Sequence, residues 1–211
     1  MTQIIGVDVG GTFTDLISFD VNSDTVRIAK VLSTPENQAF GVMKALETAE
    51  TNLPSVETLI HGTTVTTNAL LERKISRVGL ITTKGFRDVL ELGRRTRPKP
   101  YGMTGIFECI IPREFRLEVK ERIDSDGEII EPLNKNDVTK AIKKLVENGI
   151  ESLVIHFLHS YKNDIHEQIA SDIAKDLWPN SFITRGSKLV TEFREYERGT
   201  TAAINAAIQP V

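Results

Sequence analysis

The stretch that decides the fold of this chain is IIGVDVGGTFTDLI, residues 4–17. An apolar run reaches Asp8, turns through Gly10 and Gly11, and continues as a second apolar run. This order predicts a β-hairpin. Because glycine has no Cβ, the backbone N–H groups of such a turn can approach an anion closely. The alternative is an ordinary Gly-Gly hairpin, and the acids and hydroxyls around the turn favour phosphate binding over it.

The side chains around the turn suit phosphate oxygens and a hydrated metal ion. Threonine hydroxyls are donors, and Mg²⁺ prefers one or two carboxylates together with waters and phosphates. The predicted phosphate ligands are Gly10, Gly11, Thr12 and Thr14. The predicted catalytic carboxylates are Asp8 and Asp15, of which Asp8 holds Mg²⁺ through water.

Length and composition are those of an ordinary globular protein. The 211 residues carry a net charge of −3, which gives no basic field for nucleic acid. The single cysteine, Cys109, cannot form an internal disulfide, and its apolar neighbours predict an inert thiol. No apolar run approaches the roughly 20 residues that span a bilayer, and the N-terminal residues do not resemble a signal peptide. We therefore expect a cytoplasmic protein without membrane contact.

Hydrophobic periodicity predicts an α/β chain. Asn134 is expected to cap a helix that Gly149 ends in a left-handed conformation. The expected strands cover residues 3–9, 13–20, 25–32, 56–60, 77–81, 115–123, 128–130, 152–158 and 181–184. The expected helices cover residues 34–49 (with Thr34 as N-cap), 66–73, 85–92, 134–148, 164–177 and a last segment from about 192.

Two further segments are candidate ligand contacts. Residues 61–64, HGTT, follow a predicted strand and precede a predicted helix, where ligands of α/β sheets bind. Residues 94–101 gather four cations in a stretch that Pro98 and Pro100 stiffen, and arginine binds phosphate or carboxylate in bidentate fashion. A plain helix cap and a solvated loop are the alternatives. The predicted substrate contacts are His61, Thr63, Thr64, Arg94, Arg95 and Arg97.

The histidines and the last charged segment point to structural roles. His156 and His159 are expected on opposite faces of one strand, and His166 beyond a turn, so a shared metal site is disfavoured. The segment REYER, residues 194–198, opens the last helix with alternating charge. We expect a salt-bridged helix entry there in preference to ligand contact.

The same motifs resemble the N-terminal domain of the hydantoinase A/5-oxoprolinase family of the actin-like ATPase superfamily. The matching stretches are residues 4–17, 61–73, 79–88, 158–161 and 194–198, in family order along nearly the whole chain. The resemblance implies a ribonuclease H-like subdomain with an additional α/β layer. It divides the chain into the subdomain at 1–84, the second layer at 85–190, and a helix at 191–211 leading into a missing C-terminal domain.

The resemblance also implies a chemistry. It points to a hydrolase that uses ATP and Mg²⁺ to open a small cyclic amide such as a hydantoin or 5-oxoproline. The expected partners are the missing C-terminal domain and a hydantoinase B-type subunit, and this chain alone is expected to be inactive. Two alternatives stay open: a subunit of an ATP-dependent acetone or acetophenone carboxylase, and a non-catalytic nucleotide-sensing domain.

Overall fold

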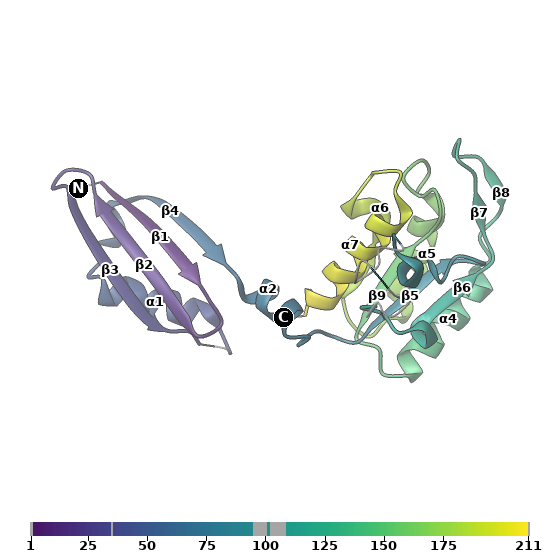
Figure 1. Ribbon diagram of the computed structural model, residues 1–211, viewed down its shortest axis with the longest axis horizontal. Coiled ribbons are helices and arrows are strands. Elements are labelled where there is room, and N and C mark those ends of the chain that lie inside the picture. The colour runs from purple at the N-terminus through teal and green to yellow at the C-terminus, as the bar shows by residue number, and fades with distance from the viewer. Residues whose placement is uncertain (1, 35, 95–100, 102–108, 211) are drawn as a thin grey trace. The chain divides into compact units, whose positions relative to one another are not determined.

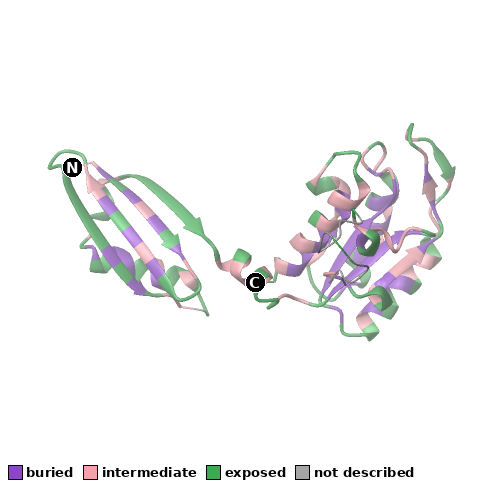
Figure 2. Ribbon diagram, viewed as in Figure 1, coloured by how far each residue is buried: buried purple, intermediate pink, exposed green. Residues whose placement is uncertain are grey.

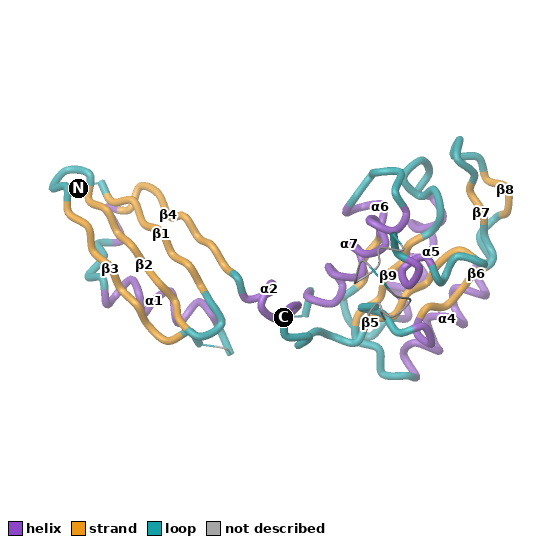
Figure 3. The backbone as a smooth tube through the Cα atoms, in the orientation of Figure 1, coloured by secondary structure: helices purple, strands orange, loops and turns teal. Residues whose placement is uncertain are grey.

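The structure, a computed structural model, describes residues 2–34, 36–94, 101 and 109–210. It divides into two compact units, residues 1–74 and 75–211, each an assembly of helices and strands (Figures 1 and 3). The predicted α/β class is confirmed. Among the described residues, none of the helices combines the length and the apolar character that crossing a membrane requires.

The first unit is a four-stranded sheet with a helix on one face (Figure 1). Its strands are β1 (Gln3–Val9), β2 (Phe13–Asp20), β3 (Thr25–Leu32) and β4 (Val56–Thr63), in the order β3-β2-β1-β4. The first three form an antiparallel meander, and β4 runs parallel to β1. Helix α1 (Gln38–Thr48) packs against this sheet.

Alternation along the strands decides which side chains of the first unit are buried. Since successive side chains point to opposite faces, Ile5, Val7 and Val9 of β1 form the core with α1. The other face carries Ile17 of β2 and Ile28 of β3, which are exposed. Figure 2 shows the same alternation as bands of buried and exposed residues along β1 and β2. Helix α2 (Val65–Leu71) follows β4.

The second unit contains a parallel sheet in the order β10-β9-β5-β6. In β9, Leu153 and Ile155 pack with α4 and α5, whereas Val154 packs with α7, so helices cover both faces. The strands are β5 (Val78–Thr83), β6 (Arg116–Val119), β9 (Ser152–His156) and β10 (Ile183–Arg185). The helices are α3 (Val89–Leu92), α4 (Lys135–Glu147), α5 (Ile165–Leu177), α6 (Gly186–Leu189) and α7 (Glu195–Ile208).

A short hairpin completes the second unit. Strands β7 (Arg122–Ile123) and β8 (Ile129–Glu131) pair antiparallel around the predicted turn. The single strand predicted at 115–123 is wrong, because a 3₁₀ turn (Arg113–Phe115) precedes β6 and a break separates β6 from β7. A second 3₁₀ turn (Leu53–Ser55) precedes β4 in the first unit.

Helix ends test the predicted caps. Asn134 accepts hydrogen bonds from Asn136 N and Asp137 N, and Gly149 has φ +66, so both predicted signals of α4 are confirmed. The predicted start of α1 at Thr34 is wrong. Asn37 is the N-cap, and its side chain accepts from Ala39 N.

The boundary between the units differs from the expected one. We expected the first subdomain to run to residue 84, but the chain divides after Lys74. Strand β5 accounts for the difference, because it pairs with β6 and β9 and not with β4. The last helix, expected as a separate part from residue 191, belongs to the second unit. Its buried alanines pack against β5 and β9. They are Ala202, Ala203, Ala206 and Ala207.

Candidate functional site

The β1–β2 turn has a backbone fixed from two sides. Gly10 N donates to Phe13 O (2.9 Å), which closes the turn. Ser33, just after β3, donates from its N to Thr12 O (2.9 Å) and from its Oγ to Gly10 O (2.7 Å). Within the part of the chain that the structure describes, the N–H groups of Gly11 and Thr12 have no hydrogen-bond partner. Two adjacent donors on a rigid turn suit an anion.

Asp8 lies beside this turn with an unengaged carboxylate. Its side chain is exposed and, among the described residues, forms no ion pair or hydrogen bond. The neighbouring strand is held close, since Thr63 Oγ1 donates to Val9 O (3.1 Å) and Thr64 N donates to the same oxygen (3.2 Å). A Cβ on Gly62 would lie 3.7 Å from Asp8 Oδ1, so Gly62 borders the carboxylate.

Some of the predicted site residues do not join this group. Thr14 is fully buried and its hydroxyl lies 3.0 Å from Ser33 Oγ, because alternation along β2 turns it toward the core. The Thr14 hydroxyl is thus engaged inside the first unit, and its contact with phosphate stays a prediction. His61 pairs with Val7 and shares the α1 face of the sheet, whereas Asp8 and Gly62 share the opposite face.

Asp15 lies directly across from Asp8 in the β1–β2 register. Both of its oxygens accept from Lys30 Nζ (2.8 and 2.9 Å), and the Lys30 ammonium also lies 4.8 Å from the Phe13 ring centroid. Neither Lys30 nor Ser33 is among the predicted site residues. Lys30 opposes Asp15 in the β2–β3 register, so a correct hairpin alignment would have found it.

The predicted basic loop falls in the second unit. Arg94 Nε donates to Glu197 Oε1 (2.6 Å), which forms the salt-bridged entry expected for the last helix. Arg95 and Arg97 lie outside the described residues. Burial raises the pKa of the Cys109 thiol, so this group stays protonated at neutral pH, as expected of an inert cysteine.

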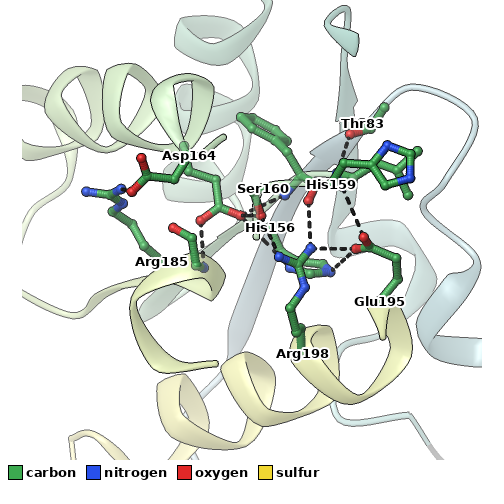
Figure 4. A network of polar contacts seen from close by, with 12 residues as sticks. Thr83, His156, His159, Ser160, Asp164, Arg185, Glu195 and Arg198 are labelled. Atoms are coloured by element: carbon green, nitrogen blue, oxygen red, sulfur yellow. Dashed lines mark hydrogen bonds and ion pairs between the residues drawn. The ribbon is translucent and has the colours of Figure 1, made fainter. Parts of the chain in front are cut away.

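A buried polar network lies where β9 ends and α7 begins (Figure 4). Arg198 is fully buried and donates to Ser160 Oγ (3.0 Å), Phe157 O (3.1 Å) and Glu195 Oε2 (2.6 Å). Glu195 Oε1 accepts from His159 N (3.0 Å). These bonds hold the loop after β9, where His159 has φ +58; the expectation that His159 lies on the strand is wrong.

His156 occupies the centre of this network. Its Nε2 lies 3.3 Å from Glu195 Oε2 and its Nδ1 lies 4.0 Å from Glu167 Oε1. Burial alone would raise the pKa of Glu195, but the contacts with His156 and Arg198 outweigh it and hold the pKa below the ordinary 4.5.

His166 makes a separate buried pair with Glu121 (2.7 Å). No cluster of three or more potential metal ligands occurs among the residues that the structure describes. Neither Glu121 nor Glu167 is among the residues predicted from the sequence, since isolated acids carry no spacing signal.

Comparisons with known proteins identify relatives that cover nearly the whole of this chain. An uncharacterized protein of Methanocaldococcus jannaschii is 43% identical over 98% of this chain and 31% of its own length. The acetophenone carboxylase gamma subunit of Aromatoleum aromaticum is 31% identical over 97% of this chain and 31% of its own length. The caprolactamase subunit alpha of Pseudomonas jessenii is 33% identical over 98% of this chain and 31% of its own length.

A solved structure supports the fold. The crystal structure of the ATP-dependent caprolactamase from Pseudomonas jessenii matches with a TM-score of 0.83 at 29% identity, over 98% of this chain and 31% of that chain. The chain thus spans about a third of the length of these relatives. A family model described as the hydantoinase/oxoprolinase N-terminal region matches residues 4–178. The chain therefore belongs to the hydantoinase/oxoprolinase N-terminal region family.

Proposed function

We propose that this chain is the phosphate-binding part of an ATP-dependent enzyme that hydrolyses a cyclic amide. The observation that carries the proposal is the β1–β2 turn, where the unpaired N–H groups of Gly11 and Thr12 lie near the unengaged carboxylate of Asp8. The caprolactamase and 5-oxoprolinases among its relatives supply the reaction class. Whether the substrate is a hydantoin, a lactam or 5-oxoproline is decided by the experiment below.

The residues of the turn have distinct roles in this proposal. The N–H groups of Gly11 and Thr12 donate to phosphate oxygens and stabilise the charge that they carry during phosphoryl transfer. Asp8 fits a hydrated Mg²⁺ because Mg²⁺ prefers one or two carboxylates plus waters, and this carboxylate is not engaged by a cation. Asp15 fits less well, since Lys30 already neutralises it.

In this proposal, phosphorylation makes the carbon of the amide, which is a poor electrophile, reactive toward water. In the proposed reaction the terminal phosphoryl group passes from ATP to the amide oxygen, and ADP is released. Water adds to the activated carbon, and the C–N bond breaks as the ring nitrogen takes a proton, which leaves an acyl phosphate. A second water hydrolyses the acyl phosphate to a carboxylate and phosphate. Arg94, Arg95 and Arg97 remain proposed substrate contacts through their guanidinium groups. His61, Thr63 and Thr64 remain proposed contacts at the end of β4.

A second candidate is an ATP-dependent ketone carboxylase subunit. The acetophenone carboxylase gamma subunit is 31% identical to this chain, close to the 33% of the caprolactamase subunit. Phosphate binding at the β1–β2 turn serves either reaction. Both relatives are named as subunits, so we propose that the enzyme works with a partner subunit.

The test is phosphate release from ATP by the complete protein that carries this chain, assayed with a hydantoin, caprolactam, 5-oxoproline and acetophenone. We expect stimulation by one cyclic amide and its loss in Asp8→Asn. Asp24→Asn is the matched control, because Asp24 is an exposed carboxylate in the β2–β3 turn of the same unit. Stimulation by the ketone alone favours the carboxylase, and a fully active Asp8→Asn enzyme contradicts the proposed role of the turn.

A further inference from the structure

Two glycines of the first unit have no packing reason to be glycine. A Cβ on Gly6, Gly10 or Gly41 would lie 3.0–3.3 Å from a neighbouring atom, so close packing explains those three. A Cβ on Gly11 or Gly62 would meet its nearest atom at 3.6 or 3.7 Å, which is ordinary contact. Neither has a positive φ. A Cβ would therefore fit at either position without a clash.

A polar side chain borders each of these two glycines. The atom that faces Gly62 is Asp8 Oδ1, and the atom that faces Gly11 is Asn68 Nδ2. Asn68 lies on α2 and is half-buried. In residues 2–34, 36–94 and 109–210, nothing forms a hydrogen bond with its side-chain amide.

Helix stability does not explain why residue 68 of α2 is an asparagine. Asparagine is a weaker helix former than alanine, since its side chain competes for backbone hydrogen bonds outside the helix. In α2, a helix of seven residues, the Asn68 side chain makes no bond that would offset this cost in the described structure. What it does have is an amide nitrogen 3.6 Å from the position that a Cβ on Gly11 would take, in the turn proposed to bind phosphate.

We propose that Asn68 is a phosphate-binding residue that donates from Nδ2 to an oxygen of the nucleotide held over Gly11. It adds a side-chain donor to the backbone N–H groups of Gly11 and Thr12. As a neutral donor it binds the phosphate without neutralising the Asp8 carboxylate. This inference rests on the proposed function, because it assigns a further ligand to the same turn.

The test is the dissociation constant of Mg·ATP, measured by titration calorimetry on the complete protein. Asn68→Asp keeps the shape of the side chain but replaces the donor with an anion, so we expect affinity to fall about tenfold or more. Asn68→Ala removes only the donor and is expected to weaken binding about three- to tenfold.

Thr67→Asp is the matched control. It places the same charge on α2, but adjacent helical residues point about 100° apart and Thr67 is exposed. We expect its affinity to stay within about twofold of the original chain, because exposed charges are screened. Thermal melting of each variant checks that α2 remains folded.

The outcomes distinguish failure of the Asn68 assignment from failure of the proposed function. Weak binding by both Asn68 variants together with normal binding by Thr67→Asp supports the assignment. If the original protein binds Mg·ATP and the Asn68 variants match it, or match Thr67→Asp, the Asn68 assignment is overturned while the proposed function stands. If the original protein does not bind Mg·ATP, the proposed function itself fails, and this assignment with it.

Discussion

Replacement of Arg198 by methionine is the sharpest test of what holds the second unit together. Arg198 is fully buried beneath the loop after β9, and its guanidinium donates to Ser160 Oγ, Phe157 O and Glu195 Oε2. Methionine has similar length and keeps the apolar contacts of the stem. The variant therefore removes the charge and the donors with little change in volume.

The expected loss of unfolding free energy depends on what surrounds the hydrogen-bond partners of Arg198. Removing one member of a buried ion pair costs about 3–5 kcal/mol, because the remaining charge is left uncompensated. The Glu195 side chain is 19% exposed and keeps its contact with His156, so water and the imidazole relieve part of the loss. We therefore expect the free energy of unfolding to fall by about 3 kcal/mol, at the lower end of that range.

The assay is urea unfolding of the 211-residue chain followed by tryptophan fluorescence. Trp178 is its single tryptophan and is buried in the core of the second unit, so the signal reports that unit. Lys175→Met is the control, since the Lys175–Asp172 pair in the same unit is 67% and 59% exposed. We expect that control to cost no more than about 0.5 kcal/mol. An Arg198→Met loss as small as that of the control would refute the reasoning.

Three further predictions concern the same unit. The pKa of Glu195 in the folded protein lies below its ordinary 4.5. The contribution of Glu195 to stability is therefore complete at pH values above its pKa in the unfolded chain, and it is lost as the pH falls through its pKa in the folded protein. The unfolding free energy of Glu195→Gln should therefore decline less than that of the original chain between neutral pH and pH values below 4.5, and an equal decline would contradict this. Gly186→Ala places a Cβ 2.6 Å from His156 Nδ1 and should cost about 1–3 kcal/mol in urea unfolding; a neutral result would show that the imidazole can move. Gly149→Ala should cost about 1–2 kcal/mol at φ +66 and Gly149→Asn less, and equal losses in thermal melts would contradict the left-handed cap.

The parts of the fold that the sequence predicts well depend on local signals. The Gly-Gly turn between alternating apolar runs predicts β1 and β2, and the structure has them at Gln3–Val9 and Phe13–Asp20. Asn134 and Gly149 predict both ends of α4 because a cap and a left-handed stop each act within one turn. The position of Gly10, Gly11 and Asp8 beside one another follows from the same hairpin.

The predictions from sequence fail where the structure depends on contacts between distant parts of the chain. Nothing within residues 77–81 indicates that β5 pairs with β9, which lies about seventy residues further along, rather than with β4. The direction of Thr14 depends on which face of β2 α1 covers, and α1 itself starts later than the Thr34 signal indicates. The network around Arg198 joins residues from α5, β9 and α7, so no spacing within one segment reveals it.

The distribution of polar contacts supports the proposed function of the β1–β2 turn. In the second unit, Glu167 accepts from Phe157 N, Ser160 Oγ and Ser187 N, and Arg198 donates to three groups, so these charges are used to hold the loop after β9. At the β1–β2 turn, the N–H groups of Gly11 and Thr12 and the Asp8 carboxylate belong to exposed residues and have no partner among the residues that the structure describes. Water can satisfy them in the free protein at little cost, and a ligand can replace that water. Buried atoms of the network, among them His156 Nδ1 and Arg198 Nε, also lack a hydrogen-bond partner in the described structure, but they are enclosed. The groups of the turn are exposed, so a ligand can reach them. The turn, and not the enclosed network, therefore carries the proposed function.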